Sequence, residues 1–335
     1  MKFHLLPLIC VTSSLAFIPP VPSVEKPLEQ LTGQDLVNYV NSAQSLFTIE
    51  HNEHTEKQMK FRLMNPKYAE PNAEGTRKKF PTRNIRLNSI PSSFDARDAW
   101  PACSSISFIR DQSTCGSCWA FATAEVISDR TCIASGQKEV AVLSPEDILS
   151  CCGSSCGAGC DGGLPIEALK WWTSTGVVTG GDYNGTGCIP YSIPPCTASP
   201  CEESETPVCS DTCQSGYEVE YADDKHKGES AYFVDSNVKA IQSEILTNGP
   251  VSAAFYVYED FYKYKKGVYK HVAGGLLGGH AVKIIGWGTN FFTPYWIVAN
   301  SWGESWGEQG YFRIHRGSNE VGIEAQVTAG KPASN

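Results

Sequence analysis

The sequence predicts an α+β protein in which a mainly helical half precedes a β-rich half. Candidate helices dominate the first half of the chain's body, whereas apolar and aromatic runs separated by glycine-rich turns follow Val251. The length of 335 residues allows two or three compact units with sizeable cores. A hydrophobic share of 41% and a charged share of 19% are those of an ordinary globular chain. The net charge of -9 argues against a nucleic-acid-binding protein, which would need a broad basic face.

The first 16 residues have the pattern of a secretory signal peptide. Lys2 precedes a short apolar run from Leu5 to Leu15, and the small residues Ser14 and Ala16 are spaced as at a signal-peptidase site. This run is shorter than the roughly 20 apolar residues that a membrane helix needs, and no later segment supplies them. We therefore expect a product without a membrane span that enters the secretory pathway and ends in a lysosome or outside the cell.

Residues 17–89 differ in composition from the rest of the chain. They contain no cysteine and hold 10 basic and 8 acidic residues, whereas residues 90–335 hold 16 basic and 28 acidic residues. These opposite charges favour an electrostatic attraction that weakens as carboxylates become protonated. Near-helical apolar spacing over 33–47 predicts an amphipathic helix capped by Thr32 and Asp35, and a more charged helix is predicted over 52–64. The basic stretch that follows has the pattern of an exposed linker, either cleavable or simply solvated.

Regular elements in the body, residues 90–335, follow from apolar patterns and prolines. Helices are predicted over 118–130, 144–150 and 164–172. Strands are predicted at Val251–Tyr258, Ala281–Trp287, Tyr295–Ala299 and Gly310–Ile314. The cysteine- and proline-rich stretch 188–213 is expected to form loops held by disulfides.

Cysteine parity predicts one free thiol. The chain has 14 cysteines, and loss of Cys10 with the signal peptide leaves 13, all between Cys103 and Cys213. In an oxidising compartment this number favours six disulfides and one unpaired cysteine. Zinc binding by the four cysteines at 151, 152, 156 and 160 is disfavoured, because their spacing is irregular and the secretory context favours disulfides.

Cys118 is the candidate nucleophile. It follows a glycine-containing turn and begins a predicted helix, where free backbone N–H groups and the helix dipole favour a thiolate. His280 follows two glycines and begins an apolar strand, a rigid position for an acid/base. Asn300 follows another apolar run, and its carboxamide can accept a hydrogen bond from the imidazole while Trp302 shields that bond from water. A lone cysteine or histidine is more often structural, so the prediction depends on the combination.

These segments together resemble the papain family of cysteine proteases over nearly all of residues 90–335. The likeness is to the cathepsin B group within that family. It is carried by Ser93-Phe94-Asp95-Ala96-Arg97, Cys151-Cys152-Gly153, the stretch from Gly187 to Cys196, Gly322-Ile323-Glu324 and, before the body, residues 36–41. The resemblance implies a papain-like fold in which a mainly helical domain faces a β-barrel-like domain across an active-site cleft. It also implies an inhibitory propeptide over 17–89.

Roles for the candidate residues follow from this resemblance. Cys118 would be the nucleophile, His280 the acid/base and Asn300 the orienting residue. The side chain of Gln112 and the backbone N–H of Cys118 would form the oxyanion hole, and no cofactor or metal is implied. The catalytic pair lies 162 positions apart, more than the roughly 130–150 usual in the family, and the inserted cysteine-rich stretch accounts for the excess.

The resemblance also implies a disulfide pattern and a substrate site. The implied pairs are Cys103–Cys132, Cys115–Cys160, Cys151–Cys209, Cys152–Cys156, Cys188–Cys213 and Cys196–Cys201. Gly162 and Gly163 would form the backbone edge for an extended substrate, because small residues allow close approach. Trp302 would lie beside the cleft. Glu324 would lie at the floor of a side-chain pocket and could receive Arg as well as apolar groups, although an ordinary solvated glutamate is an open alternative.

One departure from the cathepsin B pattern bears on activity. Members of that group have a longer loop between the cysteines that correspond to Cys196 and Cys201, with two adjacent histidines that bind the substrate's terminal carboxylate. This chain has only Thr197-Ala198-Ser199-Pro200 there, and no histidine between residues 55 and 225. We expect an open cleft, endopeptidase activity on peptides and proteins, and weak carboxydipeptidase activity.

Three further expectations concern the whole product. A monomer is expected, and the Asn184-Gly185-Thr186 sequon is a candidate glycosylation site. A non-catalytic papain-like binding protein is the alternative function. Such a protein would ordinarily have lost Cys118, His280, Asn300 or Gln112, and all four are present.

Overall fold

The computed structural model describes residues 26–51, 60–71, 73–196 and 201–334. The expected signal peptide and most of the helix predicted over 52–64 lie outside these residues.

The helices and strands of the described residues have the following bounds. Helices are α1 (Gly33–Ala43), α3 (Ala96–Ala99), α4 (Cys118–Ala134), α5 (Pro145–Cys151), α6 (Pro165–Ser174), α7 (Val238–Asn248) and α8 (Glu259–Tyr262). Strands are β1 (Phe47–Ile49), β2 (Thr82–Arg83), β3 (Phe94–Asp95), β4 (Gly228–Val234), β5 (Val251–Tyr258), β6 (Tyr264–Tyr269), β7 (Leu276–Asn290), β8 (Thr293–Ala299), β9 (Tyr311–His315) and β10 (Gln326–Pro332). Short 3-10 turns are η1 (Leu28–Gln30), η2 (Lys60–Arg62), η3 (Pro66–Ala69), η4 (Ala73–Lys78), η5 (Ser104–Ile106), η6 (Gly153–Ser155), η7 (Gly159–Asp161) and η8 (Glu320–Gly322).

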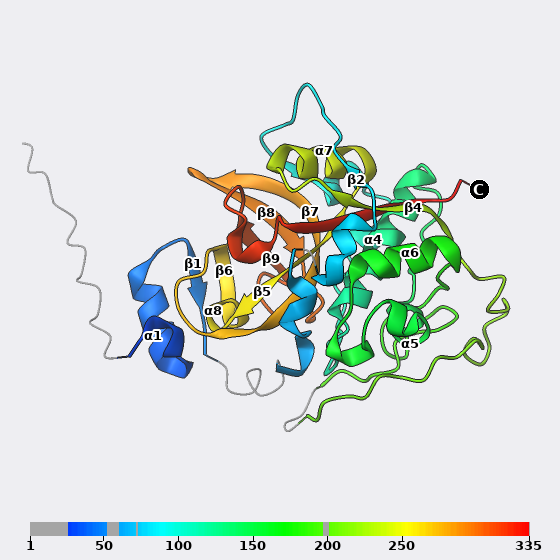
Figure 1. Ribbon diagram of the computed structural model, residues 1–335, viewed down its shortest axis with the longest axis horizontal. Helices are drawn as coiled ribbons and strands as arrows, with labels where there is room; N and C mark the ends of the chain where they lie inside the picture. Colours follow the sequence, from blue (N-terminus) through cyan, green and yellow to red (C-terminus); the bar gives the residue numbers. More distant parts are fainter. Residues whose placement is uncertain (1–25, 52–59, 72, 197–200, 335) are drawn as a thin grey trace, which may run out of the picture.

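The body has a helical half and a β-rich half, as the sequence predicts. Figure 1 shows α4, α5 and α6 on one side and the strands β5 to β9 on the other. Each half has its own hydrophobic core, one around Trp119 and Trp172 and the other around Phe255 and Trp296. The α+β prediction is therefore confirmed.

Strand β7 is central to the sheet. The described strands form a mixed sheet with the order β1-β6-β9-β8-β7-β5-β10-β4-β2, and β3 pairs with β7 off this path. Strand β7 lies antiparallel to β5, with Phe255 opposite His280, and antiparallel to β8, with Lys283 opposite Ala299. His280 is held by β5 on one edge, and β8 holds the other edge of β7 from Lys283 onward, so the histidine is placed rigidly.

Helix α4 is buried along almost its whole length. Every residue from Cys118 to Cys132 is buried, which leaves no solvent-exposed face and matches the unbroken run of apolar and small residues at its start. Its neighbours are α5, α6 and β7. Helix α5 begins at Pro145, and the side chain of Ser144 accepts a hydrogen bond from the N–H of Asp147 at 3.0 Å.

Residues 26–89, called the N-terminal segment below, depart from the prediction in three ways. Helix α1 ends at Ala43, and Phe47 begins the strand β1 instead of continuing the helix over 33–47. Thr32 precedes α1 without a side-chain capping bond, so the predicted capping box is wrong. Residues 60–62 form a 3-10 turn and Met64 pairs with Gly279, so this end of the helix predicted over 52–64 is wrong.

The physical reason for these departures is tertiary. Strand β1 pairs with the edge of β6, and β2 pairs in parallel with β4. Exposed strand edges carry unpaired N–H and C=O groups, and the N-terminal segment satisfies them by extending beside them. The apolar pattern of residues 33–47 therefore predicts correctly which side chains are buried, but it does not predict that the backbone changes from helix to strand.

Elements of the β-rich half extend beyond the predicted runs. The strands β4, β6 and β10 and the helix α7 were not among the predicted elements. Helix α7 is capped by Asn237, whose side chain accepts from the N–H of Ala240 at 2.9 Å.

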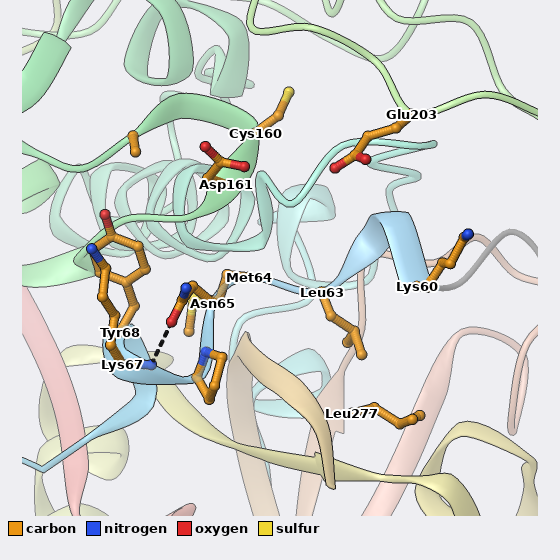
Figure 2. A pocket seen from close by; sticks show the side chains of 12 residues that line it. Lys60, Leu63, Met64, Asn65, Lys67, Tyr68, Cys160, Asp161, Glu203 and Leu277 are labelled. Atoms are coloured by element: carbon orange, nitrogen blue, oxygen red, sulfur yellow. Dashed lines mark hydrogen bonds between the residues drawn. The ribbon is translucent and has the colours of Figure 1, made fainter.

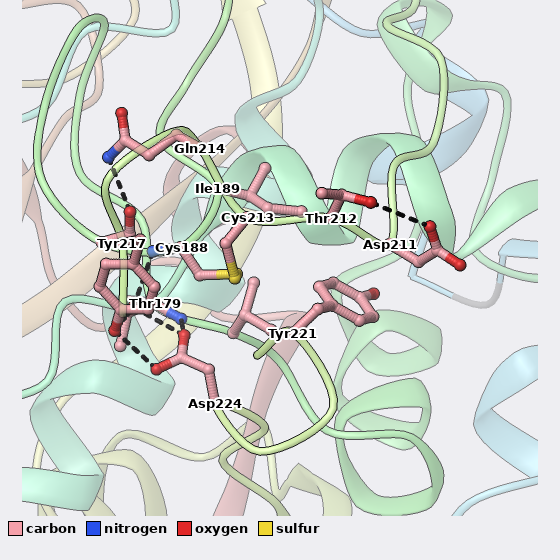
Figure 3. The surroundings of a disulfide bond; sticks show 12 residues. Thr179, Cys188, Ile189, Asp211, Thr212, Cys213, Gln214, Tyr217, Tyr221 and Asp224 are labelled. Carbon is pink, nitrogen blue, oxygen red and sulfur yellow. Dashed lines mark hydrogen bonds between the residues drawn. A yellow bond between two sulfur atoms is a disulfide. The ribbon is translucent and has the colours of Figure 1, made fainter. Parts of the chain in front are cut away.

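The twelve body cysteines other than Cys118 form the six disulfides that the resemblance implies. Figure 3 shows the bond between Cys188 and Cys213, which staples the long loop region of the helical half. The carboxylate of Asp224 supports this loop by accepting from Thr179 N at 2.7 Å and from Tyr217 Oη at 2.8 Å. Among the described cysteines, Cys118 alone is free.

Candidate active site

Cys118 is the first residue of α4 and is fully buried, with 0% of its surface exposed. Burial raises the pKa of its thiol to about 12, against backbone hydrogen bonds from Ala281, Trp119 and Met64 that lower it. Ala281 directly follows His280 on β7, so the thiol lies where the helical half meets the β-rich half. Met64 belongs to the N-terminal segment, which therefore reaches the candidate nucleophile.

His280 and Asn300 form a buried hydrogen-bonded pair. Nε2 of His280 lies 2.7 Å from Oδ1 of Asn300, and a carboxamide oxygen only accepts, so Nε2 carries the proton. The other ring nitrogen, Nδ1, has no hydrogen-bond partner within the described residues and is available for proton exchange with a thiol. The Trp302 ring lies over the imidazole with a centroid distance of 4.5 Å, which keeps water from the pair.

The surroundings of Cys118 and His280 favour the uncharged forms of both side chains. The pKa of His280 is lowered to about 4, mainly by burial and in part by the positive charge of Arg62, while the bond to Asn300 acts in the opposite direction. A neutral imidazole and a protonated thiol are therefore the stable forms over most of the pH range. Arg62 belongs to the N-terminal segment, so this segment helps to keep the pair uncharged.

Gln112 points its amide at the N-terminal segment. Its Nε2 donates to the carbonyl oxygen of Arg62 at 2.9 Å and to that of Cys115 at 2.8 Å. Its Oε1 accepts from Oγ of Ser301 at 2.7 Å, which orients the amide so that the N–H groups face the cleft. The donor that could stabilise an oxyanion is thus occupied by a backbone carbonyl.

The N-terminal segment passes between the two halves of the body. Met64 exchanges two backbone hydrogen bonds with Gly279, at 3.0 and 2.8 Å, and Asn65 N donates to Asp161 O at 3.0 Å. The two bonds of Met64 are to the strand that carries His280, and the bond of Asn65 is to the last residue of η7. The segment thus bridges the cleft as an extended strand does.

A pocket of about 450 Å³ opens where this crossing occurs, shown in Figure 2. The N-terminal segment lines one side of it, from Lys60 to Tyr68. Asp161 and Glu203 of the body lie on the opposite side, and Leu63 faces Leu277. The acidic wall belongs to the body and the lysines belong to the segment, as the separate charge balances of the two parts suggest.

The two glycines expected at the substrate edge have different surroundings. Gly162 has φ +123°, and a Cβ there would lie 2.6 Å from Cβ of Met64. A Cβ on Gly163 would lie 2.6 Å from the Trp119 ring, so its small size serves internal packing. In this structure the bond to the N-terminal segment comes from the carbonyl of Asp161, next to Gly162.

Glu324 is buried, with 4% of its surface exposed, which excludes the solvated alternative. Its carboxylate accepts from Trp296 Nε1 and Asn319 N, each at 2.9 Å, and from Gly317 N. It lines a pocket of about 290 Å³ together with Arg77 of the N-terminal segment. The side chain therefore shapes a pocket and also holds the loop at 317–319.

Two contributors to the site were not found from the sequence. Arg62 donates to the carbonyl of Trp302 at 3.0 Å and forms an ion pair with Asp111 at 3.4 Å. Ser301 orients Gln112 from 189 positions away. The basic character of the N-terminal segment and the Asn-Ser-Trp sequence were visible, but neither indicates these partners.

Comparison with known proteins defines the class. The family model described as "Papain family cysteine protease" matches residues 90–331. The chain therefore belongs to the papain family of cysteine proteases, and it is a cysteine-type peptidase. Its fold and its Cys118, His280 and Asn300 arrangement agree with that assignment.

Relatives narrow the assignment to one group. A Caenorhabditis elegans protein named "Gut-specific cysteine proteinase" is 59% identical over 331 residues, covering 99% of each chain. "Cathepsin B-like cysteine proteinase 3" of the same organism is 54% identical over 301 residues, covering 88% of this chain and 81% of the relative. The solved structure "proCathepsin B S9 from Trypanosoma congolense" has a TM-score of 0.78 and 34% identity, covering 91% of this chain and 99% of that one. The chain is a cathepsin B-like cysteine proteinase in its zymogen form.

The described residues contain neither a candidate metal cluster nor a candidate membrane helix. No group of three or more His, Cys, Asp or Glu side chains there is arranged to hold a metal ion. Within the same ranges, none of the helices has the length and apolar character that a membrane crossing requires.

Proposed function

We propose that this protein is the zymogen of an endopeptidase in which Cys118 is the nucleophile and His280 the general acid/base. The Cys118 thiolate adds to a peptide carbonyl, and the imidazolium of His280 protonates the leaving amine. The acyl-enzyme thioester is then hydrolysed by water that His280 deprotonates, which restores the thiol. Asn300 positions the imidazole throughout. The amide of Gln112 and the backbone N–H of Cys118 stabilise the oxyanion.

The free thiol next to the His280 strand is the observation that carries this assignment. Cys118 is unpaired while every other described cysteine is bonded, and the helix α4 that it begins packs against β7, the strand of His280. The bond between His280 and Asn300 fixes the tautomer and leaves Nδ1 for the thiol.

We assign residues 17–89 as an inhibitory propeptide. The carbonyl of Arg62 occupies the Gln112 donor, and the backbone of Met64 pairs beside the catalytic histidine. Both contacts stand where substrate would bind, so removal of this part of the chain opens the cleft. Gly162 and Gly163, the ring of Trp302 and the carboxylate of Glu324 would then line the substrate site.

Endopeptidase activity is proposed from the segment between Cys196 and Cys201. It has four residues and no histidine, so it lacks a cation to bind a substrate's terminal carboxylate. Recognition of a free C-terminus needs a charge-assisted hydrogen bond that this segment cannot supply. Carboxydipeptidase activity should accordingly be weak.

Paired substrates test this proposal. The processed enzyme is given a peptide with a free C-terminal carboxylate and its amidated twin, with Cys118→Ala as the control for contaminating proteases. Equal internal cleavage of both twins is expected, and no cleavage by Cys118→Ala. Release of dipeptides from the free acid at more than ten times the rate of its twin would refute the endopeptidase assignment.

A labelling experiment separates catalysis from the alternative of a binding protein. An epoxide peptide inhibitor needs an activated thiolate inside a peptide-binding cleft. Labelling of processed protein at Cys118 is expected. Correctly disulfide-bonded, processed protein that stays unlabelled and inactive would favour the binding-protein alternative.

The remaining proposals concern the destination and state of the product. We propose passage through the secretory pathway, because six disulfides form in oxidising compartments. The name of the gut-specific relative favours secretion into a digestive space over lysosomal retention. Asn184 is exposed in a turn closed by Gly185 N and Asp182 O at 2.7 Å, which suits a glycan acceptor. We propose a monomer.

A further inference from the structure

Three charged side chains lie buried where the nucleophile helix meets the histidine strand. Glu125 and Asp129 are on α4, and Lys283 is on β7. Nζ of Lys283 lies 3.0 Å from Oδ2 of Asp129 and 3.8 Å from Oε2 of Glu125. Lys283 and Asp129 are 0% exposed and Glu125 is 5% exposed. None of the three takes part in the proposed chemistry.

Their sequence positions connect them to the catalytic pair. Glu125 and Asp129 are four residues apart on one face of α4, two and three turns after Cys118. Lys283 is two residues after Ala281 on β7, so both side chains point from the same face of the strand. Ala281 meets the thiol and Lys283 meets the carboxylates, which gives α4 and β7 two successive points of contact.

Lys283 also contacts η5 through its side chain and β8 through its backbone. It donates to the carbonyl oxygens of Ser105 and Ile106 at 3.3 and 3.4 Å. In the pairing of β7 with β8, Lys283 lies opposite Ala299, the residue before Asn300. The Lys283 side chain therefore connects the helix of Cys118 with the strand of His280, and the backbone of the same residue pairs with the strand that leads to Asn300.

We propose that Lys283 and Asp129 are positioning residues that hold Cys118 in register with His280, and that ionisation of Glu125 weakens this join toward neutral pH. The proposal rests on the assignment of Cys118 and His280 as the catalytic pair. A buried ion pair tolerates little displacement, because separated charges inside a protein are costly. It therefore keeps two packed elements in one relative position.

The charge balance around Glu125 explains the pH dependence. Glu125 faces the cations Lys283 and Arg110, the carboxylates Asp129 and Asp182, and the phenol of Tyr311. Two cations balance two carboxylates while Glu125 is protonated, and its ionisation leaves one buried negative charge in excess.

Burial sets the pH window. Burial raises the pKa of Glu125 to about 7, whereas the pKa of a glutamate in the unfolded chain is about 4.3. Between these values the folded protein holds one more proton than the unfolded chain. Stability therefore falls as the pH rises through this window, and levels off above it.

Asp129→Asn tests the positioning role in enzyme processed from the full chain. We expect kcat to fall at least tenfold with KM within twofold, and the pH profile of Cys118 alkylation to shift. Glu244→Gln is the matched control, because Glu244 accepts from Arg130 of the same helix at 3.0 Å but does not join it to β7. It should lower Tm while leaving kcat within twofold. An Asp129→Asn enzyme with wild-type kcat and alkylation profile would overturn the proposal.

A charge-neutral pair covers the case in which Asp129→Asn does not fold. Asp129→Asn combined with Lys283→Met removes both charges together, so at acidic pH, where Glu125 is protonated, the substitution leaves no unpaired charge buried. This double variant should fold and show the same loss of kcat. Wild-type kcat in the double variant would also overturn the positioning role.

Glu125→Gln tests the pH dependence. The wild-type enzyme should lose activity faster at pH 7.5 than at pH 5.0, and the ratio of the two half-lives should fall at least threefold in the variant. An unchanged ratio would show that Glu125 does not weaken the join. Epoxide labelling of the wild type at Cys118 is scored separately, so failure of the catalytic assignment is distinguished from failure of the positioning cluster.

Discussion

The amide nitrogen Nε2 of Gln112 donates to the carbonyl oxygen of Arg62 at 2.9 Å. A substrate carbonyl undergoing attack would need this same donor, so in the proposed propeptide role the N-terminal segment would inhibit by occupying the oxyanion site. Arg62 adds its positive charge to the lowering of the His280 pKa. One residue thus acts on the donor and on the acid/base.

Removal of the oxyanion donor should slow the processed enzyme without abolishing activity. Gln112→Ala is expected to lower kcat by about 10²–10³-fold, a loss of about 2.7–4 kcal/mol of transition-state stabilisation. Gln112→Glu keeps the volume but replaces the N–H donor, and it should lose as much. Steady-state kinetics on an internal peptide substrate measure both. A loss of less than threefold in both variants would exclude Gln112 from the oxyanion hole.

Arg62 should control latency. Arg62→Met removes the hydrogen bond to Trp302 O and the ion pair with Asp111, so the zymogen should process itself at least fivefold faster at acidic pH. An enzyme processed at the proposed boundary after residue 89 would lack residue 62, and its kcat provides an internal reference. Arg86→Met removes an exposed positive charge from the same segment and should leave the rate unchanged. Equal processing rates for both variants would contradict this role.

Alkylation should distinguish the two states of the thiol. The pKa of Cys118 is raised to about 12 in the zymogen, so the thiol is protonated at pH 8 and reacts slowly. Removal of the N-terminal segment lets water reach the site and lets His280 become an imidazolium, and both changes favour the thiolate. Iodoacetamide should modify the processed enzyme at least about 100-fold faster than the zymogen. Comparable rates, followed by mass spectrometry at Cys118, would contradict the buried resting state.

The bond between His280 and Asn300 should set the alkaline limit of activity. Asn300→Asp keeps an acceptor oxygen near Nε2 and adds a negative charge, which favours the imidazolium and raises the pKa of His280. The alkaline limb of the kcat/KM profile should therefore move upward by about half a pH unit or more. A limb that stays in place or moves downward would show that Asn300 does not act through the imidazole.

Gly162 should be needed for the segment to bind and for local backbone geometry. Gly162→Ala brings a Cβ to 2.6 Å from Cβ of Met64, at a φ of +123° that costs a non-glycine residue about 1–3 kcal/mol. A synthetic N-terminal segment should inhibit the processed variant at least tenfold more weakly than wild type. Gly136→Ala, at φ +67° with nothing within 4 Å of its Cβ, is the matched control and should lower Tm without changing inhibition. Equal inhibition of both variants would refute the steric argument.

Local sequence was sufficient for the elements nearest the chemistry. Cys118 begins α4 as predicted, because a glycine-containing turn followed by an unbroken run of buried side chains favours a helix start. The strand β5 has the predicted bounds Val251–Tyr258, since an apolar and aromatic run between turns is typical of a central strand. Parity alone required one free thiol, whereas the six disulfide partners came from the resemblance and not from spacing.

Long-range pairing was beyond the sequence. Phe47 continues an apolar pattern that favours a helix, yet it forms a strand because the edge of β6 offers backbone partners. The size of Gly163 was assigned to substrate approach, and the ring of Trp119 also requires it.

The sequence by itself therefore indicated the class of enzyme and the division into helical and β-rich halves, and it predicted the nucleophile and its partners that the proposed function uses. Only the tertiary structure decided that Arg62 holds the Gln112 donor and that Lys283 meets Asp129 and Glu125 across the join. The physical reason is the separation in sequence of the residues that make these contacts. Helix and strand periodicity report contacts within a few residues, whereas these contacts join positions 50 to 158 residues apart and exist only once the two halves have packed.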